Sequence, residues 1–178
     1  MIVFGAGAIG ILAAQMARIA GAGKIFMAGR SSDEEYRFNV AKEIGCADRY
    51  INVDKEDTLG IVLESTQGIG TDIAIEASGA APAIKSAIEA LKKKGKLIAI
   101  GLTGKDSVSI PWDSAMKKVL DVYFNMSSSY RGWEIAIRLL EQSKLKLQPM
   151  ITIESIDNWE KAFTNIQTGK ALKVLLKI

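Results

Sequence analysis

Histidine is absent from this chain of 178 residues, and cysteine occurs once, as Cys46. Because histidine and cysteine are the usual ligands of zinc, these residues cannot assemble a His/Cys zinc site by themselves. Histidine is also the side chain that most often transfers protons near neutral pH. The single cysteine excludes an internal disulfide and suits a reducing compartment such as the cytoplasm. The composition therefore argues against a zinc centre or a histidine-based proton relay within the chain.

The sequence also lacks long apolar runs and a large net charge. No apolar stretch approaches the ~20 residues that a transmembrane helix needs. A net charge of +3 is too small to indicate binding to nucleic acid or to a membrane surface. Met1 is followed directly by an apolar run, so we expect no secretory signal peptide. With 48% hydrophobic and 24% charged residues, the chain has the profile of a soluble globular protein, which we expect in the cytoplasm.

Strand-like and helix-like segments alternate along the first hundred residues. This alternation predicts an α/β fold, a doubly wound parallel sheet of the Rossmann type. The expected strands are Ile2–Phe4, Lys24–Ala28, Arg49–Asn52, Asp72–Ala77 and Lys96–Ile100. The expected helices are Ala8–Ala20, Ser32 to Gly45, Asp54 to about Gln67, and Ala80–Lys94.

Local signals also predict how these helices begin and end. Ser32 with Glu35 reads as a capping box, and Asp54 is expected to cap the third helix. The run Lys92 to Lys94 stands in the expected last turn of the fourth helix. There it favours an interaction with the helix C-terminus over a role in phosphate binding.

After Gly101 the pattern changes to a C-terminal extension of helices and strands. Three tryptophans fall on apolar helix faces, and we expect them in the core: Trp112, Trp133 and Trp159. The expected strands are Val108–Ile110, which Pro111 confines to a sheet edge, Leu120–Asn125, Pro149–Ile153 and Leu172–Ile178. The expected helices are Trp112–Val119, Arg131–Lys144 and Asp157–Thr168, the last capped by Asp157 with Glu160.

The segment Gly5-Ala6-Gly7-Ala8-Ile9-Gly10 lies between the first expected strand and the first expected helix. In this context Gly5 allows the tight turn, Gly7 lets the backbone approach a pyrophosphate, and Gly10 lets the helix pack closely. The helix N-terminus presents free N–H groups and a partial positive charge to the phosphates. The pattern therefore predicts a site for a nicotinamide dinucleotide that includes Ala8 and Ile9.

The end of the second expected strand bears on the choice between NAD and NADP. An acidic residue usually binds the ribose hydroxyls there, but this chain has Gly29, followed by Arg30 and Ser31. Glycine leaves space for a 2′-phosphate, which Arg30 and Ser31 can bind, and this favours NADP. The alternative is that Arg30 is a solvated turn residue and that Asp33 or Glu34 reaches the ribose.

Further cofactor contacts are expected where other strands end, because parallel sheets bind ligands at their carboxyl edge. The expected residues are Ala77, Ser78, Gly101, Leu102, Asn125 and Ser127. Glu76 is a charge within a buried strand, and we expect a structural carboxylate with partners. Cys46 is expected to be a buried structural thiol.

Segments spread over the whole chain resemble the zinc-type medium-chain alcohol and polyol dehydrogenases, which include sorbitol, threonine and galactitol-phosphate dehydrogenases. This distribution makes the resemblance more specific than the glycine motif alone. The matching segments are Gly5 to Gly10, Ala41-Lys42-Glu43-Ile44-Gly45, Glu76-Ala77-Ser78-Gly79, Pro111-Trp112-Asp113, Trp133 with Leu139-Leu140, Trp159-Glu160-Lys161-Ala162-Phe163 and Gly169 to Leu176.

The resemblance implies a division of labour. In that family a GroES-like catalytic domain, with the zinc ligands and the proton relay, precedes the coenzyme domain. The chain would then comprise an NAD(P)-binding domain, residues 1–125, and a segment, residues 126–178, that packs on the absent catalytic domain. Asn125 and Ser127 would lie beside the nicotinamide. The strand Val108–Ile110 would pair with its mate in a homodimer or tetramer. No catalytic or metal-binding residue is expected here.

The expected function is that of the coenzyme-binding portion of an oxidoreductase, a dehydrogenase that acts on a polyol or similar secondary alcohol. The chain alone is expected to bind the dinucleotide and to be inactive. Two alternatives stay open: a fragment from the zinc-free quinone or enoyl reductase branch, and a non-catalytic dinucleotide-binding module. A Rossmann methyltransferase is disfavoured because it too normally has an acid where Gly29 stands.

Overall fold

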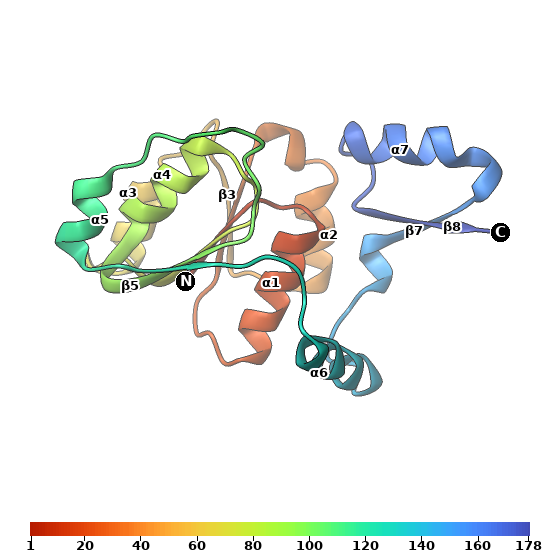
Figure 1. Cartoon of the computed structure of the whole chain (residues 1–178), viewed down its shortest axis with the longest axis horizontal. Coiled ribbons are helices and arrows are strands. Elements are labelled where there is room, and N and C mark those ends of the chain that lie inside the picture. Colours follow the sequence, from red (N-terminus) through yellow and green to blue (C-terminus); the bar gives the residue numbers. More distant parts are fainter.

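The computed structural model describes all 178 residues and contains two parallel sheets (Figure 1). The larger sheet has the strand order β3-β2-β1-β4-β5-β6, and the smaller sheet pairs β7 with β8. Helices cover both faces of the larger sheet, which confirms the predicted doubly wound α/β fold. The strands are β1 Ile2–Phe4, β2 Phe26–Gly29, β3 Arg49–Asn52, β4 Thr71–Glu76, β5 Leu91–Ala99, β6 Asp121–Phe124, β7 Ile151–Ser155 and β8 Lys173–Lys177.

Seven α-helices and three short 3-10 helices connect these strands. The α-helices are α1 Ala8–Ile19, α2 Arg37–Ile44, α3 Thr58–Ser65, α4 Ala81–Ala90, α5 Trp112–Lys118, α6 Tyr130–Glu141 and α7 Trp159–Gln167. The 3-10 helices are η1 Ser31–Asp33, η2 Gln148–Met150 and η3 Ile156–Asn158.

Two hydrophobic cores lie on opposite faces of the larger sheet. Successive side chains of a strand point to opposite faces, so neighbouring residues enter different cores. Val3 and Met27 pack against α1 and α2, whereas Phe4 and Phe26 pack against α3 and α4. Figure 1 shows these two helix pairs on the two sides of the sheet. This explains why the strands are apolar throughout rather than alternating.

The topology reverses direction next to β1. The chain runs from β1 to β2 and β3 on one side, and then crosses back to β4, β5 and β6 on the other. Phe4 and Glu76, the last residues of β1 and β4, are aligned in the parallel register. Ligands of such sheets bind outside the carboxyl ends of the strands at this reversal. The segments that begin at Gly5 and Ala77 therefore flank the position expected for a ligand.

Two helix starts differ from the sequence prediction. The segment after β2 first forms η1, in which the Asp33 side chain accepts from the Arg30 N–H, and α2 begins only at Arg37. Asp57, rather than Asp54, caps α3 by accepting a hydrogen bond from the N–H of Gly60. Both predictions failed because several Asp and Ser residues compete for each cap. The predicted end of α2 at Gly45, with φ +74°, is confirmed.

The lysine run does not end a helix. The helix α4 stops at Ala90, and Lys92 to Lys94 lie in the irregular first part of β5, where Lys94 has φ +58°. Lys92 pairs with Asp72 on the neighbouring strand. The carbonyl groups at the end of α4 instead accept hydrogen bonds from the Lys118 ammonium group on α5. Burial lowers the pKa of Lys118.

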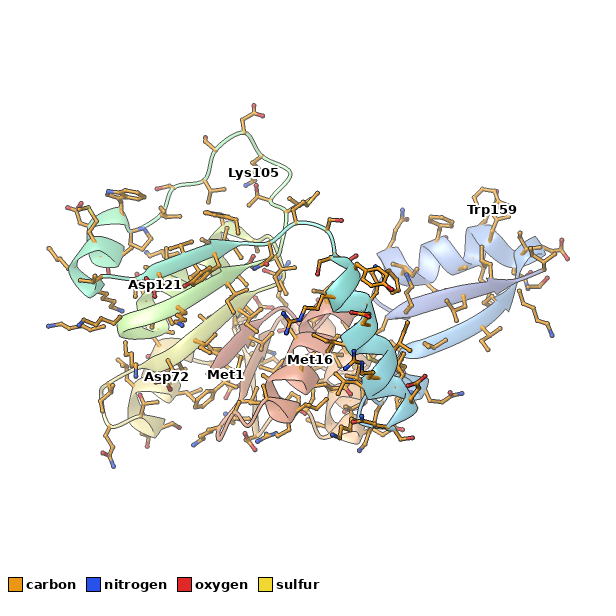
Figure 2. All side chains as sticks on the ribbon, turned by 60° about the horizontal axis from the view of Figure 1, so that its bottom comes forward. Met1, Met16, Asp72, Lys105, Asp121 and Trp159 are labelled. Carbon is orange, nitrogen blue, oxygen red and sulfur yellow. The ribbon has the colours of Figure 1, made fainter.

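Several expectations for the C-terminal part are wrong. Val108–Ile110 forms no strand within the chain, whereas its expected pairing with a second copy stays a prediction, and the loop through Lys105 extends away from the sheet (Figure 2). Ser155 bonds to the N–H of Asp157 before η3, so Asp157 does not cap α7. The three tryptophans are not core residues, because Trp112, Trp133 and Trp159 are 64%, 63% and 50% exposed. α5 and α7 pack part of their surface within the chain, through Ala115 and buried Ala162, whereas α6 contains no buried residue.

The C-terminal segment folds as β7, α7 and β8 beside α2 (Figures 1 and 2). Its strands pair in parallel register, with Ile151 opposite Lys173. Buried Gln15 of α1 anchors the preceding turn, because its side chain accepts from the Lys146 N–H at 2.9 Å and donates to the Lys146 carbonyl at 3.2 Å. Met150 enters the core on the α1 and α2 face. None of the helices is both long and apolar enough to cross a membrane.

Candidate functional site: the carboxyl edge of the large sheet

The glycine turn joins β1 tightly to α1. Gly5 has φ +104°, a left-handed conformation that glycine adopts without steric cost. A Cβ atom at Gly10 would lie 1.8 Å from the carbonyl oxygen of Gly5, so only glycine fits where the helix crosses the turn. Gly7 is different, because no atom lies within 4 Å of the position of its Cβ. The predicted packing role of Gly10 therefore holds, and the space above Gly7 is open.

The first turn of α1 faces this open space. Gly7 is the N-cap, no side chain caps the helix, and the first turn contains no acidic residue. Backbone N–H groups at a helix start lack intrahelical partners and carry a partial positive charge. In this first turn Ala8 is half-buried and Ile9 is 53% exposed. The turn is thus suited to an anion that approaches the backbone.

The turn after β4 contacts the glycine turn on one side and the turn after β5 on the other. A Cβ atom at Gly5 would lie 3.1 Å from the Ser78 nitrogen. A Cβ atom at Gly101 would lie 2.2 Å from the Gly79 nitrogen, so the turns after β4 and β5 pack backbone against backbone. The structure therefore brings together Ala77, Ser78, Gly101 and Leu102, as expected for adjacent strand ends. Leu102 is 77% exposed, so its side chain covers nothing within the chain.

Glu76 holds the turn after β4. The residue is 1% exposed, and its carboxylate accepts hydrogen bonds from the N–H groups of Ser78 and Gly79, at 2.8 and 3.0 Å. The Ser78 hydroxyl donates to it as well. Burial of a charge is tolerated when several donors satisfy it. Glu76 is therefore a structural carboxylate, as predicted, although its partners are backbone and hydroxyl donors rather than a cation.

The carboxylate of Asp33 lies against the end of β2, although the strand itself ends in Gly29. A Cβ atom at Gly29 would lie 2.8 Å from Asp33 Oδ2, so the Asp33 carboxylate covers Gly29. Asp33 is 6% exposed, accepts from the Arg30 N–H at 2.8 Å and forms an ion pair with Arg37 at 2.9 Å. Gly29 therefore does not leave a void, because Asp33 and Phe38 fill it.

A second carboxylate reaches this corner from β3. Asp54 Oδ2 accepts a hydrogen bond from the Ser31 N–H at 2.8 Å, and its Oδ1 lies 3.7 Å from Arg30 Nε. The bond from Ser31 lowers the pKa of Asp54 below its ordinary value. Asn52 bonds to the hydroxyl of Ser31 as well, at 3.1 Å. Arg30 and Ser31 are thus already engaged by side chains of the chain itself.

The far end of the site follows β6. The Asn125 N–H donates to the Ala99 carbonyl at 2.9 Å, which places Asn125 at the carboxyl edge beside β5. Ser127, two residues later, has φ +65°. Both residues are exposed. The structure places them at the same edge of the sheet without showing what they bind.

A family comparison matches residues 8–142 to the model of zinc-binding dehydrogenases. The chain belongs to the zinc-binding dehydrogenase family. It is 37% identical over 177 residues to a sorbitol dehydrogenase of Halalkalibacterium halodurans, covering 99% of this chain and 51% of that protein. It is 32% identical to a D-arabitol-phosphate dehydrogenase of Enterococcus avium, covering 99% and 50%. The chain thus spans about half the length of the curated relatives it matches.

Solved structures agree with this assignment. The alcohol dehydrogenase TADH from Thermus sp. ATN1 superposes with a TM-score of 0.90 at 26% identity, covering 99% of this chain and 50% of that one. An alcohol dehydrogenase from E. coli CFT073, solved with NADH, superposes with a TM-score of 0.85 at 21% identity, covering 99% and 51%. The latter similarity supports the fold alone.

The side chains of this chain do not provide a set of ligands for a zinc ion. No group of three His, Cys, Asp or Glu side chains lies in a suitable arrangement. Cys46, the single thiol, is buried as predicted, and burial raises its pKa. The glycine turn, in contrast, suits a dinucleotide, because it offers open space and free N–H groups at a helix start.

The sequence analysis did not anticipate that Asp54 contacts Ser31 and Arg30 at this edge of the sheet. The signal was present, since β2 and β3 are parallel neighbours, and Gly29 is opposite Asn52 in their register. Residues just after each strand must therefore meet at the carboxyl edge. The local capping pattern at Asp54 concealed this contact.

Proposed function

We propose that this chain is the coenzyme-binding portion of an NAD(P)-dependent alcohol or polyol dehydrogenase. The observation that carries the proposal is the contrast between Gly10, which has no room for a side chain, and Gly7, which has open space. This is what a backbone pressed against a pyrophosphate requires. The relatives, which include sorbitol and D-arabitol-phosphate dehydrogenases, support an alcohol substrate over the reductase branch and over a non-catalytic module.

In the proposed complex the dinucleotide lies along the carboxyl edge of the sheet. The pyrophosphate meets the N–H groups of Ala8, Ile9 and Gly10 at the start of α1. The adenosine ribose lies near Gly29 and Ser31, and the nicotinamide half extends toward the far strands. The residues proposed there are Ala77, Ser78, Gly101, Leu102, Asn125 and Ser127.

The nicotinamide, when bound, supplies hydride transfer to or from a carbinol carbon. Residues of this chain bind and orient the cofactor, and their turns form the floor beneath it. The chain offers no donor set for zinc, and we route no step of catalysis through a metal here. We therefore expect binding of the dinucleotide by the purified chain without oxidation of an alcohol.

Calorimetric titration of the purified chain with NADH and with NADPH tests the proposal. The decisive variant is Gly7→Val, because Gly7 has extended backbone and open surroundings, so the fold accepts the side chain while the pyrophosphate does not. We expect its affinity to fall by at least about tenfold. Gly23→Val is the matched control, since Gly23 also has nothing within 4 Å but lies at the opposite edge.

Failure of the unaltered chain to bind either dinucleotide would contradict the proposal. So would equal affinity of the Gly7→Val and Gly23→Val variants. Oxidation of a polyol by the purified chain with added zinc would show that it is more than the coenzyme-binding portion.

We also propose that a second copy pairs at Val108–Ile110, in a homodimer or tetramer. The supporting observation is that this segment has no strand partner within the chain. Backbone N–H and carbonyl groups without a strand partner can pair with those of another copy. Light scattering should give a single-chain mass for Ile110→Asp and an unchanged mass for the control Ser107→Asp.

A further inference from the structure

Ion pairs surround β3 and the segment that follows β2. Four basic side chains here contact acidic side chains of the chain itself, whereas Lys42, which lines the same pocket as Glu34 and Asn52, lies over the Tyr50 ring instead. The four ion pairs are Arg30 with Asp54, Arg37 with Asp33, Arg49 with Glu56, and Lys55 with Glu34. A phosphate next to Ser31 would meet Arg30 only together with the carboxylate of Asp54.

Asp54 occupies the donors that a 2′-phosphate would need. Its carboxylate takes the Ser31 N–H at 2.8 Å and lies beside Arg30, which is otherwise 75% exposed in its side chain. The loop that carries Asp54 is held in place, because the Asp54 N–H donates to Asn52 Oδ1 at 2.9 Å. The low pKa of Asp54 keeps the carboxylate charged at neutral pH. An anion therefore already fills the position next to Ser31.

The carboxylate of Asp33 adds to the negative charge next to Arg30 and Ser31. Asp33 covers Gly29 and accepts the N–H of Arg30, so the backbone on both sides of the strand end bonds to acidic side chains. A 2′-phosphate carries nearly two negative charges at neutral pH, and like charges at such a distance repel strongly. Ribose hydroxyls carry no charge and do not meet this repulsion.

We propose that Asp54, at the end of β3, is the residue that makes this chain select NAD over NADP. The inference rests on the proposed function, since it needs a dinucleotide along this edge. Gly29, Arg30 and Ser31 taken alone favour NADP. Their contacts with Asp33 and Asp54 lead us to the opposite preference. The discriminating charge comes from the adjacent strand rather than from the end of β2.

The decisive variant is Asp54→Asn, which keeps an oxygen that can accept the Ser31 N–H but removes the charge. We expect NADPH affinity to rise by about tenfold, because Arg30 is released to bind the phosphate and the repulsion disappears. NADH affinity should change by less than about threefold. Calorimetric titration of both nucleotides gives the ratio of their dissociation constants, which is the quantity of interest.

Two controls define the result. Asp57→Asn removes an equal charge three residues away, at the cap of α3, and should leave the ratio unchanged. Arg30→Ala in the Asp54→Asn background should abolish the gain for NADPH, whereas Arg30→Ala alone should alter the ratio little. Circular dichroism verifies the fold of each variant, and Asp54→Ser serves as the second uncharged variant if Asp54→Asn does not fold.

The possible outcomes are distinct. Binding of neither nucleotide by the unaltered chain would overturn the proposed function and this inference together. Binding of both nucleotides with NADPH equal to or tighter than NADH would overturn the inference alone. An unchanged ratio in both Asp54 variants would also overturn it, because the discrimination would then come from elsewhere.

Discussion

Phe4 and Phe124 are both the last residues of parallel strands in one sheet, yet Phe4 is 2% exposed and Phe124 is 86% exposed. The difference extends to the two parts of the chain. After residue 100, only Met150, Ala162, Ala171 and Leu172 are buried. The first part thus builds its own core, whereas the second part presents apolar side chains outward.

The reason lies in how the helices cover the sheet. β1 and β2 are central and have helices on both faces, so every side chain meets a partner. β6 lies at the edge, and all four of its residues are exposed. A sheet is stable when both faces are covered, so exposed apolar side chains on an edge strand indicate surfaces shaped for something outside the chain.

The largest predicted effect separates the two phenylalanines. Phe4→Ala should lower the free energy of unfolding by about 3–5 kcal/mol, because it removes a buried ring and leaves a cavity. Phe124→Ala should change it by less than about 0.5 kcal/mol, since the ring touches solvent already. Urea denaturation of both variants measures the difference. Similar losses would mean that β6 is as well packed as β1.

A smaller loss is expected at the turn after β4. Glu76→Ala leaves the N–H groups of Ser78 and Gly79 without their acceptor in a buried setting. The free energy of unfolding should fall by about 2 kcal/mol. Glu64→Ala, on the exposed side of α3, is the control and should be nearly neutral. Equal effects of the two substitutions would show that the buried carboxylate does not hold the turn.

The sequence predicted the first part of the chain well because its signals are local and reinforce one another. The glycine motif requires a turn, since Gly10 presses on the Gly5 carbonyl, and Gly45 ends α2 in the left-handed conformation. Short apolar runs bounded by turn residues indicate buried strands. Such features depend on neighbours a few residues away, so they can be read without the fold.

The errors arise where distant parts of the chain decide the outcome. Asp54 has a capping pattern, but its carboxylate bonds to Ser31, 23 residues earlier, because two parallel strands end side by side. Trp133 lies on an apolar helix face that predicts burial, but burial requires a covering partner, and no residue of its helix is buried in this chain. A pattern shows that a face is apolar without showing what covers it.

A pH-dependent effect distinguishes two tyrosines. Burial raises the pKa of Tyr50 in the packed part to about 12, above its ordinary value of 10.0. The unfolded chain therefore loses this proton first, and stability that is complete below pH 10 declines as the pH rises to about 12. Tyr50→Phe should remove this part of the decline, at a cost near neutral pH of about 1 kcal/mol for the bond to the Ala41 carbonyl.

Tyr130, 82% exposed in the second part of the chain, supplies the control. Urea denaturation between pH 9 and 12, at constant ionic strength, measures both variants. The Tyr130→Phe variant should retain the alkaline loss of stability that Tyr50 causes. If Tyr50→Phe also retains that loss in full, the hydroxyl of Tyr50 is not the group responsible.

The smallest effect on folding is expected in β8, where Leu175 is 46% exposed. Leu175→Lys should change the free energy of unfolding by less than about 0.5 kcal/mol. It should nevertheless reduce association between copies, because the two-stranded sheet of β7 and β8 has free edges and exposed apolar side chains. Gln167→Lys adds the same charge on α7 without removing an apolar side chain. Light scattering over a range of concentrations should show weaker association for Leu175→Lys alone, and equal behaviour of the two variants would show that charge, rather than the apolar surface of β8, governs association.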